Sequence, residues 1–372
     1  MRIAMLSAHP EVHGPLPKLT PLLAAALREL GCDVRVQCWG RRRERESIWQ
    51  KLVQRPADIW RARRMLHQHA ADLVIVHTAH SWATLLRDIP LLLALRRRDR
   101  PVVLQFHGSL CDRLVAPGRS AFKLASKLLV VCSDAALVLS SEEQRQWHAF
   151  NPNGRFHVVR NPFVPDARLA PAPLRARFAV AGNAPIVLFV GRLIEAKGIL
   201  DLVDVLAQRS PNLPWHLLVV GEGPLDQEVR RRAAQAGVDG HLTLTGYLHG
   251  AALQAAYELA DVLVLPTRSE GFPLVILEGM AAGLPVITTG IRGMADHLRE
   301  GVNALLVPPA EPPALAAALT RLLADRELRA RMGEVNRATV GEFSPDRVGR
   351  HYLDVLRQVA AANPVLSRRG LG

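Results

Sequence analysis

Cysteine is scarce in this sequence, and its arrangement excludes two kinds of scaffold. The 372 residues hold four cysteines, Cys32, Cys38, Cys111 and Cys132, without a C-x-x-C pair and without a histidine in register with them. That spacing fits neither a zinc site nor a disulfide framework. Buried free thiols are the expectation, because an unpaired cysteine behaves as a small apolar side chain.

Long apolar stretches are absent as well. No run of apolar residues reaches the length that a membrane-spanning helix needs. The first ten residues lack the basic start, long apolar core and small-residue cleavage site of a secretory leader. Hydrophobic residues still make up 49% of the chain and charged residues 22%, which favours globular domains over disorder. We therefore expect a cytoplasmic protein of two domains, since the chain is too long for one ordinary core.

Acidic residues are fewer than basic ones, and the imbalance lies in the first half. Residues 1–170 contain 26 Lys and Arg against 14 Asp and Glu, so that they carry +12 of the net charge of +13. Such a face attracts nucleic acid, anionic membrane or an acidic substrate, or is a set of solvated helix ends. The segment from Arg41 to Met65 mixes Trp49 and Trp60 with arginines and interrupts the strand and helix pattern. It suits a membrane-interfacial segment, an acceptor-binding lip, or a helix with buried tryptophans.

Short apolar runs alternate with helix-length segments along the whole chain. Twelve strands are predicted, at 2–7, 33–39, 73–77, 102–106, 136–139, 156–159, 186–190, 216–220, 242–247, 262–266, 286–289 and 304–307. This alternation indicates two parallel sheets with helices on both faces, separated by the proline-containing stretch 165–185. Amphipathic helices are expected at 312–332 and 345–362. Ligands of such sheets bind at the carboxyl ends of the strands.

Three strands of the first half end in residues with binding chemistry. The first strand is followed by a loop with one glycine, Gly14. The third strand ends in His77, with His80 after it, and the fourth is followed by His107 and Gly108. A glycine lets the backbone approach a ligand closely, so His107 beside Gly108 is the best placed of the set. The alternative for His107 is a histidine hydrogen-bonded at a domain edge. For His77 and His80 a structural role is favoured, because no carboxylate accompanies them.

Cations and carboxylates follow two strands of the second half. The strand 186–190 runs through Gly191 into Arg192 and Lys197, and the strand 262–266 runs into Glu270 and a helix that starts near Pro273. Arginine offers a planar fork and lysine a mobile point charge for phosphate oxygens. The helix start adds backbone N–H groups and a dipole that favour an anion. These residues predict a diphosphate site, with surface cations as the alternative.

The order and spacing of these motifs resemble the retaining family 4 glycosyltransferases. The resemblance rests on Gly191-Arg192…Lys197-Gly198, Gly221-Glu222-Gly223-Pro224 and Ser269-Glu270-Gly271-Phe272-Pro273…Glu278, the last with the E-x7-E pair of that family. It covers about 186–345, and more loosely the first half through His107-Gly108, Ser140-Ser141 and Asn161-Pro162. It implies an α/β GT-B fold, in which two Rossmann-like domains with parallel sheets face a central cleft. Residues 1–170 would form the acceptor-binding domain, 171–345 the nucleotide-sugar-binding domain, and 346–372 a helix that crosses back to the N-terminal domain, with a tail.

The resemblance also assigns roles to single residues. Arg192 and Lys197 would hold the diphosphate, Glu270 the hydroxyls of the donor sugar and Glu278 the ribose, while His107 would lean over the donor sugar. Further donor contacts would come from Gly191, Tyr247, Gly271, Phe272, Pro273 and Leu274, and the acceptor side would include Gly14 and Gly108. One departure concerns this acceptor side, because Gly14 stands beside Pro15 where the family often has two adjacent glycines.

The hypothesis from the sequence is retaining transfer of a hexosyl group from a nucleotide diphosphate sugar, with a UDP-linked donor slightly favoured. The acceptor would be a glycan or a lipid-linked hydroxyl of envelope or exopolysaccharide assembly, with an anionic membrane surface as a further candidate partner and no nucleic acid. We expect no cofactor and no metal, because Arg192, Lys197 and the helix dipole can stabilise the leaving diphosphate. Front-face attack and double displacement on Glu270 both stay open.

Three other classes of protein remain as alternatives. A GT-B sugar-nucleotide epimerase or phosphorylase would share the sheets but not the ordered Arg, Lys and paired-Glu set. A non-catalytic partner subunit would use the basic face to bind lipid or protein. A nicotinamide oxidoreductase is the least favoured, since the Gly-x-Gly at 221–223 lacks the third glycine of the dinucleotide fingerprint.

Overall fold

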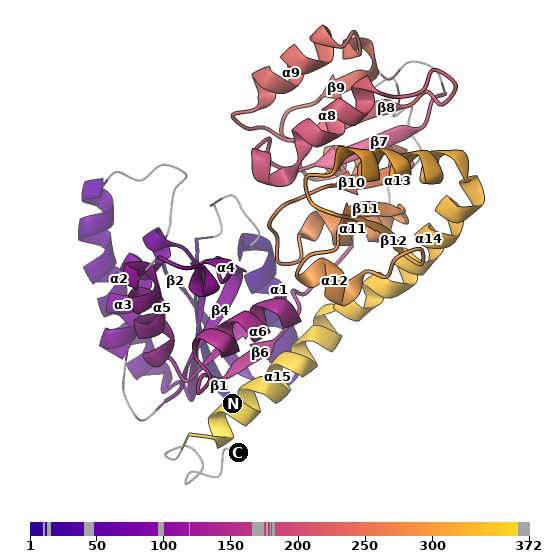
Figure 1. The fold of residues 1–372 in the computed structure, drawn as a ribbon. Helices are drawn as coiled ribbons and strands as arrows, with labels where there is room; N and C mark the ends of the chain where they lie inside the picture. The colour runs from indigo at the N-terminus through magenta and orange to yellow at the C-terminus, as the bar shows by residue number, and fades with distance from the viewer. Residues whose placement is uncertain are drawn as a thin grey trace. The chain divides into compact units, whose positions relative to one another are not determined.

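Two compact units make up the chain (Figure 1). The computed structural model describes residues 1–9, 12, 16–40, 48–95, 100–118, 120–165, 175, 178, 180 and 183–363. Unit 1 comprises residues 1–163 and 342–372, and unit 2 comprises residues 164–341. The sequence suggested limits at 170 and 345 for the same division.

Unit 1 is built on one sheet of six parallel strands in the order β2-β1-β3-β4-β5-β6. The strands are β1 (Arg2–Ser7), β2 (Asp33–Cys38), β3 (Leu73–His80), β4 (Val102–Ser109), β5 (Ala135–Val138) and β6 (Phe156–Val158). All six were predicted from the apolar runs. Parallel strands need both faces covered, and their continuous Val, Leu and Ile content reflects that burial.

Helices cover both faces of this sheet. They are α1 (Leu16–Glu29), α2 (Ile48–His69), α3 (Trp82–Leu95), α4 (Asp112–Val115), α5 (Ser120–Val131), α6 (Ser141–Phe150) and α15 (Pro345–Ala361). Because side chains alternate along a strand, Ile3 and Met5 pack with α1 and α15 on one face. Ala4 and Leu6 belong to the core that α2, α3, α5 and α6 cover on the other face.

Unit 2 repeats this architecture, with a parallel sheet in the order β12-β11-β10-β7-β8-β9. Its strands are β7 (Ile186–Val190), β8 (His216–Val220), β9 (Leu242–Leu244), β10 (Val262–Leu265), β11 (Val286–Thr289) and β12 (Ala304–Val307). Its helices are η1 (Glu195–Lys197), α8 (Ile199–Ala207), α9 (Asp226–Gln235), η2 (Asp239–His241), α10 (Ala251–Leu259), α11 (Leu274–Ala282), α12 (Gly293–His297), α13 (Pro312–Ala324) and α14 (Arg326–Thr339), with η3 (Val340–Phe343) leading out. These six strands also confirm the prediction.

Two predictions about helices were wrong. Residues 48–69 do not interrupt the pattern, because they form the regular helix α2 between β2 and β3, while residues 41–47 lie outside the described ranges. The single helix predicted at 312–332 is two helices that meet at Asp325. Asp325 has φ −112° and ψ 94°, and its carboxylate accepts a hydrogen bond from the N–H of Leu328 at 2.8 Å. An aspartate that caps a new helix in this way ends the previous one.

The structure also shows the state of the cysteines and the character of the apolar helices. All four cysteines are free thiols, three of them buried and Cys38 half-buried, as expected. Within the described ranges, no helix combines the length and the apolar character needed to cross a bilayer.

The last helix, α15, packs on unit 1 although it follows unit 2 in the sequence (Figure 1). Gly349 lies so close to α1 that an added Cβ would be 2.9 Å from the Cβ of Ala26. One turn further, the buried hydroxyl of Tyr352 donates a hydrogen bond to Oε1 of Gln105 at 2.8 Å. The final segment of the chain is therefore part of the N-terminal core.

Replacing Gly349 with valine is expected to lower the free energy of unfolding by about 1–3 kcal/mol, because the branched side chain overpacks the contact with Ala26. Urea unfolding followed by circular dichroism measures the change. The control is Gly341→Ala, since an added Cβ at Gly341 meets nothing within 4 Å. Equal unfolding midpoints for Gly349→Val and the wild type would contradict a close α1 and α15 contact.

Candidate functional site

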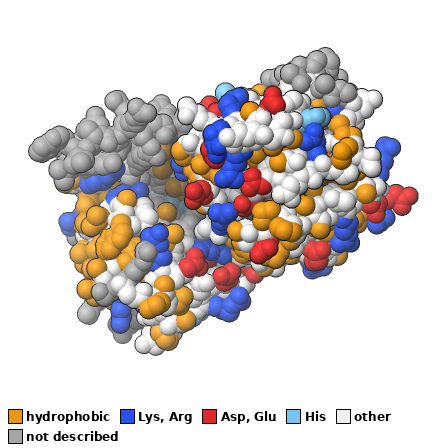
Figure 2. Space-filling view, turned by 45° about the horizontal axis from the view of Figure 1, so that its top comes forward, with side chains coloured by type: hydrophobic (Ala, Val, Ile, Leu, Met, Phe, Trp, Pro, Cys, Tyr) orange, Lys and Arg blue, Asp and Glu red, His pale blue; other side chains and the backbone are white. Residues whose placement is uncertain are grey.

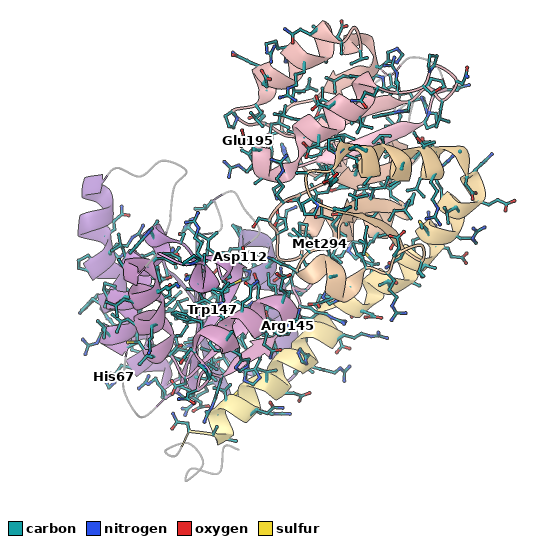
Figure 3. All side chains as sticks on the ribbon, viewed as in Figure 1. His67, Asp112, Arg145, Trp147, Glu195 and Met294 are labelled. Carbon is teal, nitrogen blue, oxygen red and sulfur yellow. The ribbon has the colours of Figure 1, made fainter. Side chains whose placement is uncertain are left out.

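The ends of β7 and β10 bring opposite charges together in unit 2. β7 continues through Gly191 and Arg192 to Lys197 in η1, the short helix that begins at Glu195 (Figure 3). β10 is its parallel neighbour and continues into the loop that carries Glu270. Nζ of Lys197 forms a salt bridge with Oε1 of Glu270. Arg192, five residues before Lys197 in the sequence, is exposed. The predicted cation and carboxylate therefore meet at one edge of the sheet.

Glycines make these backbone approaches possible. A Cβ at Gly198 would lie 2.1 Å from the carbonyl oxygen of Pro266, and Gly198 has a left-handed φ of 71°. A Cβ at Gly221 would lie 1.9 Å from the carbonyl oxygen of Gly191. The Gly-x-Gly at 221–223 thus serves to pack β8 closely against the end of β7. A Cβ at Gly223 would lie 2.4 Å from the carbonyl oxygen of Leu193, so close packing accounts for both glycines without a dinucleotide.

The electrostatics of Lys197 reflect its partial burial. Its side chain is 18% exposed and that of Glu270 is 23% exposed. Burial and the positive charge of Arg192 lower the pKa of Lys197 to about 8. With a pKa of about 8, Lys197 is still charged at neutral pH, where it faces the Glu270 carboxylate. A dianionic ligand between Arg192 and Lys197 would favour the same charged form.

The helix α11 begins directly after the Glu270 loop. Pro273 occupies its N-cap position with no side-chain cap, and Gly283 ends it in a left-handed conformation with φ 81°. The helix start and stop predicted from the sequence are both confirmed. Gly271 and Phe272 are buried, and Leu274 opens the helix. An uncapped helix start leaves backbone N–H groups available for an anion next to Lys197 and Glu270.

Glu278 lies in α11 and is held by a residue that the sequence did not point to. The hydroxyl of Tyr257, which is 1% exposed, donates a hydrogen bond to Oε2 of Glu278 at 2.7 Å. Burial and the Glu278 charge raise the pKa of Tyr257, so it stays a donor. The only available sequence signal was a tyrosine on the helix that precedes β10.

Tyr247, expected near the base, is 58% exposed and stacks on His249 with centroids 6.1 Å apart.

A loop after β11 supports the same edge and was also missed. The N–H of Gly293 donates to the carbonyl oxygen of Gly271 at 2.9 Å, and a Cβ at Gly293 would lie 2.5 Å from that oxygen. The preceding residue, Arg292, has a φ of 47°, which is strained for a side chain with a Cβ, and is 6% exposed. Met294 follows in α12 (Figure 3). Arg292 and Gly293 thus fix the position of the Gly271 backbone.

Unit 1 holds a pair of histidines at the ends of β3 and β4. Nδ1 of His77 and Nε2 of His107 are 2.9 Å apart, and the rings stack with centroids 5.1 Å apart. Burial lowers the pKa of His77 to about 4, and burial with the nearby His77 also lowers the pKa of His107 well below its usual value. Both rings are therefore neutral at pH 7. Nε2 of His77 and Nδ1 of His107 are buried, and neither has a hydrogen-bond partner among the described residues.

The remaining residues of unit 1 that the sequence singled out are Gly108, His80 and Gly14. Gly108 follows His107, and an added Cβ there would meet no atom of the described residues within 4 Å. His80 is structural, as expected, because it is buried against Ser126, Phe122 and Trp147. Gly14, with its neighbour Pro15, lies outside the described residues.

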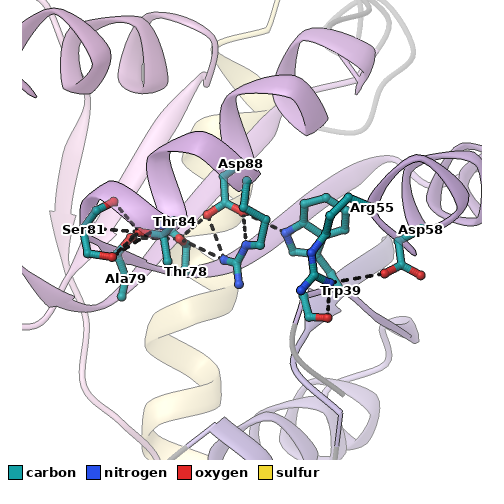
Figure 4. A network of polar contacts seen from close by, with 10 residues as sticks. Trp39, Arg55, Asp58, Thr78, Ala79, Ser81, Thr84 and Asp88 are labelled. Atoms are coloured by element: carbon teal, nitrogen blue, oxygen red, sulfur yellow. Dashed lines mark hydrogen bonds and ion pairs between the residues drawn. The ribbon is translucent and has the colours of Figure 1, made fainter. Parts of the chain in front are cut away.

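A second polar network in unit 1 fixes α3 to the ends of β2 and β3 (Figure 4). The carboxylate of Asp88 is 0% exposed and accepts a hydrogen bond from Nε1 of Trp39 at 2.8 Å. It also accepts from Thr78, and from Nε and Nη2 of Arg87 at 2.6 and 2.9 Å. The charge of Asp88 is thus neutralised inside the fold.

Comparison with known families matches both units. The family described as Glycosyl transferases group 1 matches residues 173–339, and the family described as Glycosyltransferase Family 4 matches residues 22–167. A D-inositol 3-phosphate glycosyltransferase of Xylanimonas cellulosilytica is 30% identical over 312 residues, which are 78% of this chain and 73% of that protein. The lipopolysaccharide core biosynthesis glycosyltransferase LpsE of Rhizobium meliloti is 32% identical over 183 residues, 49% of this chain and 52% of that protein.

Solved structures share the fold over nearly the whole chain. The sucrose-phosphate synthase of Thermosynechococcus elongatus superposes with a TM-score of 0.78 at 22% identity, over 97% of this chain and 99% of that one. HepE of Anabaena, solved with UDP and glucose, superposes with a TM-score of 0.73 at 19% identity, over 96% of this chain and 100% of that one. At this level of identity the likeness establishes the fold.

Replacing Tyr257 with phenylalanine is expected to lower the free energy of unfolding by about 1.5–3 kcal/mol at pH 7, because the Glu278 carboxylate loses a charge-assisted hydrogen bond. Urea unfolding measures the change. Tyr247→Phe is the matched control and should stay within about 0.5 kcal/mol of the wild type, because water reaches the exposed Tyr247 side chain. An unchanged midpoint for Tyr257→Phe would contradict the proposed positioning of Glu278.

Proposed function

The chain belongs to glycosyltransferase family 4, and we propose that it is a retaining enzyme that moves a hexosyl group from a nucleoside diphosphate sugar to a hydroxyl acceptor. The observation that carries this proposal is the meeting of Lys197 and Glu270 at the uncapped start of α11, with Arg192 on the adjacent strand end. A diphosphate needs cations and backbone N–H groups, and a sugar needs a hydrogen-bond acceptor.

The donor would lie along the edge formed by the ends of β7 and β10. Arg192 and Lys197 hold the diphosphate oxygens, together with the backbone from Gly271 to Leu274. Glu270 accepts hydrogen bonds from the sugar hydroxyls, and Glu278, oriented by Tyr257, accepts from the ribose. Gly191 and Tyr247 complete the donor contacts. A UDP-linked donor is slightly favoured, and the relative HepE was solved with UDP and glucose.

The chemical step breaks the bond between the anomeric carbon and the diphosphate oxygen. In the front-face route, the acceptor oxygen bonds to that carbon on the side that the diphosphate leaves, and the acceptor proton passes to a diphosphate oxygen. Arg192, Lys197 and the α11 dipole stabilise the negative charge that builds on the leaving group, so no metal is invoked. The salt bridge of Glu270 to Lys197 supports this route, because a paired carboxylate is a weaker nucleophile.

The acceptor is proposed to be a glycan or a lipid-linked intermediate of envelope polysaccharide assembly, handled by unit 1 at the cytoplasmic face of the membrane. One relative acts in lipopolysaccharide core biosynthesis. The basic balance of residues 1–170 suits an anionic acceptor or surface. Within unit 1, the neutral pair His77 and His107 offers hydrogen-bonding nitrogens to a substrate, and no atom of the described residues lies within 4 Å of a Cβ built at Gly108.

Thermal unfolding with a panel of nucleotide sugars tests the donor proposal. A true donor at saturation should raise the melting temperature by about 5 °C or more, because it binds only the folded state. Release of free nucleotide should then require a hydroxyl acceptor, which separates a transferase from an epimerase.

Arg192→Ala should lower turnover about 10²- to 10³-fold, since it removes a cation at the developing charge.

Arg230→Ala is the matched control for this experiment, because Arg230 is an exposed cation paired with Asp226 on α9. It should leave both the melting shift and the turnover unchanged. If no nucleotide sugar raised the melting temperature, the donor site would be wrong. Equal losses in Arg192→Ala and Arg230→Ala would likewise contradict a specific role for Arg192.

The Michaelis constant for the donor is expected to rise as the pH increases through about 8, because Lys197 loses its charge in the free enzyme above its pKa. Below that pH the ammonium is present and binding is at its strongest. Lys197→Arg should abolish this rise, since a guanidinium stays charged over the whole range. Initial rates at several pH values measure it. A rise of the same size in Lys197→Arg would mean that another group titrates.

A further inference from the structure

The solvent-facing side of α3 is apolar along its whole length. Its exposed residues recur at helical spacing, and the larger ones are Trp82, Leu86 and Leu93, which are 45%, 72% and 51% exposed. Ala83 and Pro90 lie on the same stripe and are also exposed. A surface helix normally presents polar residues to water. The outer face of α3 therefore has the composition of a buried face.

The neighbouring helix α5 extends this apolar surface. Its exposed residues include Leu124, Leu128 and Val131, which are 72%, 41% and 51% exposed. The two helices touch through Trp82 and Phe122, whose rings lie edge to face with centroids 5.4 Å apart. Figure 2 shows hydrophobic side chains gathered over this part of unit 1. Contiguous exposed patches of this kind mark interaction sites.

The exposed charges carried by the described parts of α2, α3 and α5 are of one sign, although Asp112 on α4 and Asp134 after α5 are exposed acids at the border. In the described parts of α2, α3 and α5, the acidic residues are Asp58 and Asp88, and both are 0% exposed. Asp58 forms salt bridges with Arg55 and Arg61, and Asp88 forms one with Arg87. The exposed charges of these helices are therefore cationic, and they include Arg63, Arg64 and Lys127.

A cavity between α2 and α3 adds an aromatic residue to the cationic margin. It has a volume of about 580 Å³ and is lined by Trp60, Arg63 and Arg64 on α2 and by Ala94 and Leu95 on α3. Trp60 is 59% exposed, and the guanidinium of Arg64 lies 5.3 Å from the centre of its ring. Tryptophan with arginine is favoured where an apolar layer meets charged groups.

We propose that the outer surface of α3 and α5, with the cationic margin of α2, docks unit 1 on an anionic lipid bilayer. Trp82, Leu86, Leu93, Leu124, Leu128 and Val131 would enter the acyl boundary, and Arg63, Arg64 and Lys127 would meet lipid phosphates. A second copy of the chain is a poorer occupant, because the exposed charges of these three helices are cationic in both copies. The inference rests on the proposed function, to which it adds the surface that brings the enzyme to a membrane-borne acceptor.

Co-sedimentation with vesicles tests this surface. The full-length protein is mixed with phosphatidylcholine vesicles with and without phosphatidylglycerol. Binding should require the anionic lipid and should weaken several-fold between low and high salt, because the Debye length shortens. The double variant Leu86→Glu with Leu124→Glu should bind at least about 10-fold more weakly, since two apolar contacts are lost. Both leucines are 72% exposed, so the fold does not depend on them.

The matched control is Val302→Glu with Val335→Glu, which makes the same charge change on exposed valines of unit 2. It should bind vesicles within about 2-fold of the wild type, because these valines belong to unit 2 and not to the proposed docking surface. Equal losses in both double variants, binding to neutral vesicles alone, or no binding would overturn the proposal. So would a stable dimer in sedimentation velocity that Leu86→Glu with Leu124→Glu dissociates.

The donor-induced melting shift separates this proposal from the proposed function. The variant with Leu86→Glu and Leu124→Glu should keep the full shift, because the donor residues lie in unit 2. A wild-type protein that responds to a nucleotide sugar but ignores anionic vesicles would overturn the docking surface and leave the donor site standing. A protein that binds vesicles as described but responds to no nucleotide sugar would overturn the donor site instead.

Discussion

The salt bridge between Lys197 and Glu270 is the interaction on which the candidate site depends. Both side chains are largely removed from water, and a charge in that position is costly unless a partner lies beside it. The partner is available only because Gly198 lets η1 touch the backbone of Pro266. In the proposed reaction the ligand enters this balance, since the diphosphate adds negative charge near Lys197 while the sugar hydroxyls satisfy Glu270. The close backbone packing at Gly198 therefore also positions the charged groups that would bind the substrate.

The residues around this salt bridge are held by other elements of unit 2. Tyr257 orients Glu278 from α10, and Gly293 fixes the backbone of Gly271 from the loop after β11. Arg292 adopts a strained φ so that Gly293 can make this contact. Strain is tolerated where the surroundings overdetermine a conformation, which is common at functional sites. The site is thus supported by α10 and by the loop after β11, although its charged residues lie after β7 and β10 and in α11.

Unit 1 uses the same architecture for different chemistry. Its buried polar groups pair among themselves, as in the Asp88 network and the two neutral histidines, so that little negative charge reaches the surface of α2 and α3. The outer faces of α3 and α5 are apolar, and the exposed charges on the described parts of α2, α3 and α5 are cationic. Unit 2 thus brings opposite charges together at strand ends. Unit 1 instead pairs its buried polar groups with one another and presents apolar and basic side chains on the outer surface of α2, α3 and α5. This contrast matches the uneven charge of the sequence.

The sequence by itself determined the twelve strands, the two parallel sheets, the limits of α11 and the family, because these depend on local periodicity and on motifs of contiguous residues. It also identified Arg192, Lys197, Glu270 and Glu278 as candidate residues. Only the tertiary structure decided which groups pair with them: Lys197 with Glu270, Tyr257 with Glu278, and His77 with His107. Each of these contacts joins residues 21 or more positions apart along the chain, whose meeting depends on strand order and side-chain direction. The exposed apolar stripe of α3 was not predicted, for the same reason. A run of leucines next to a strand is typical of a buried helix, and only the fold shows which side of the helix has no neighbour.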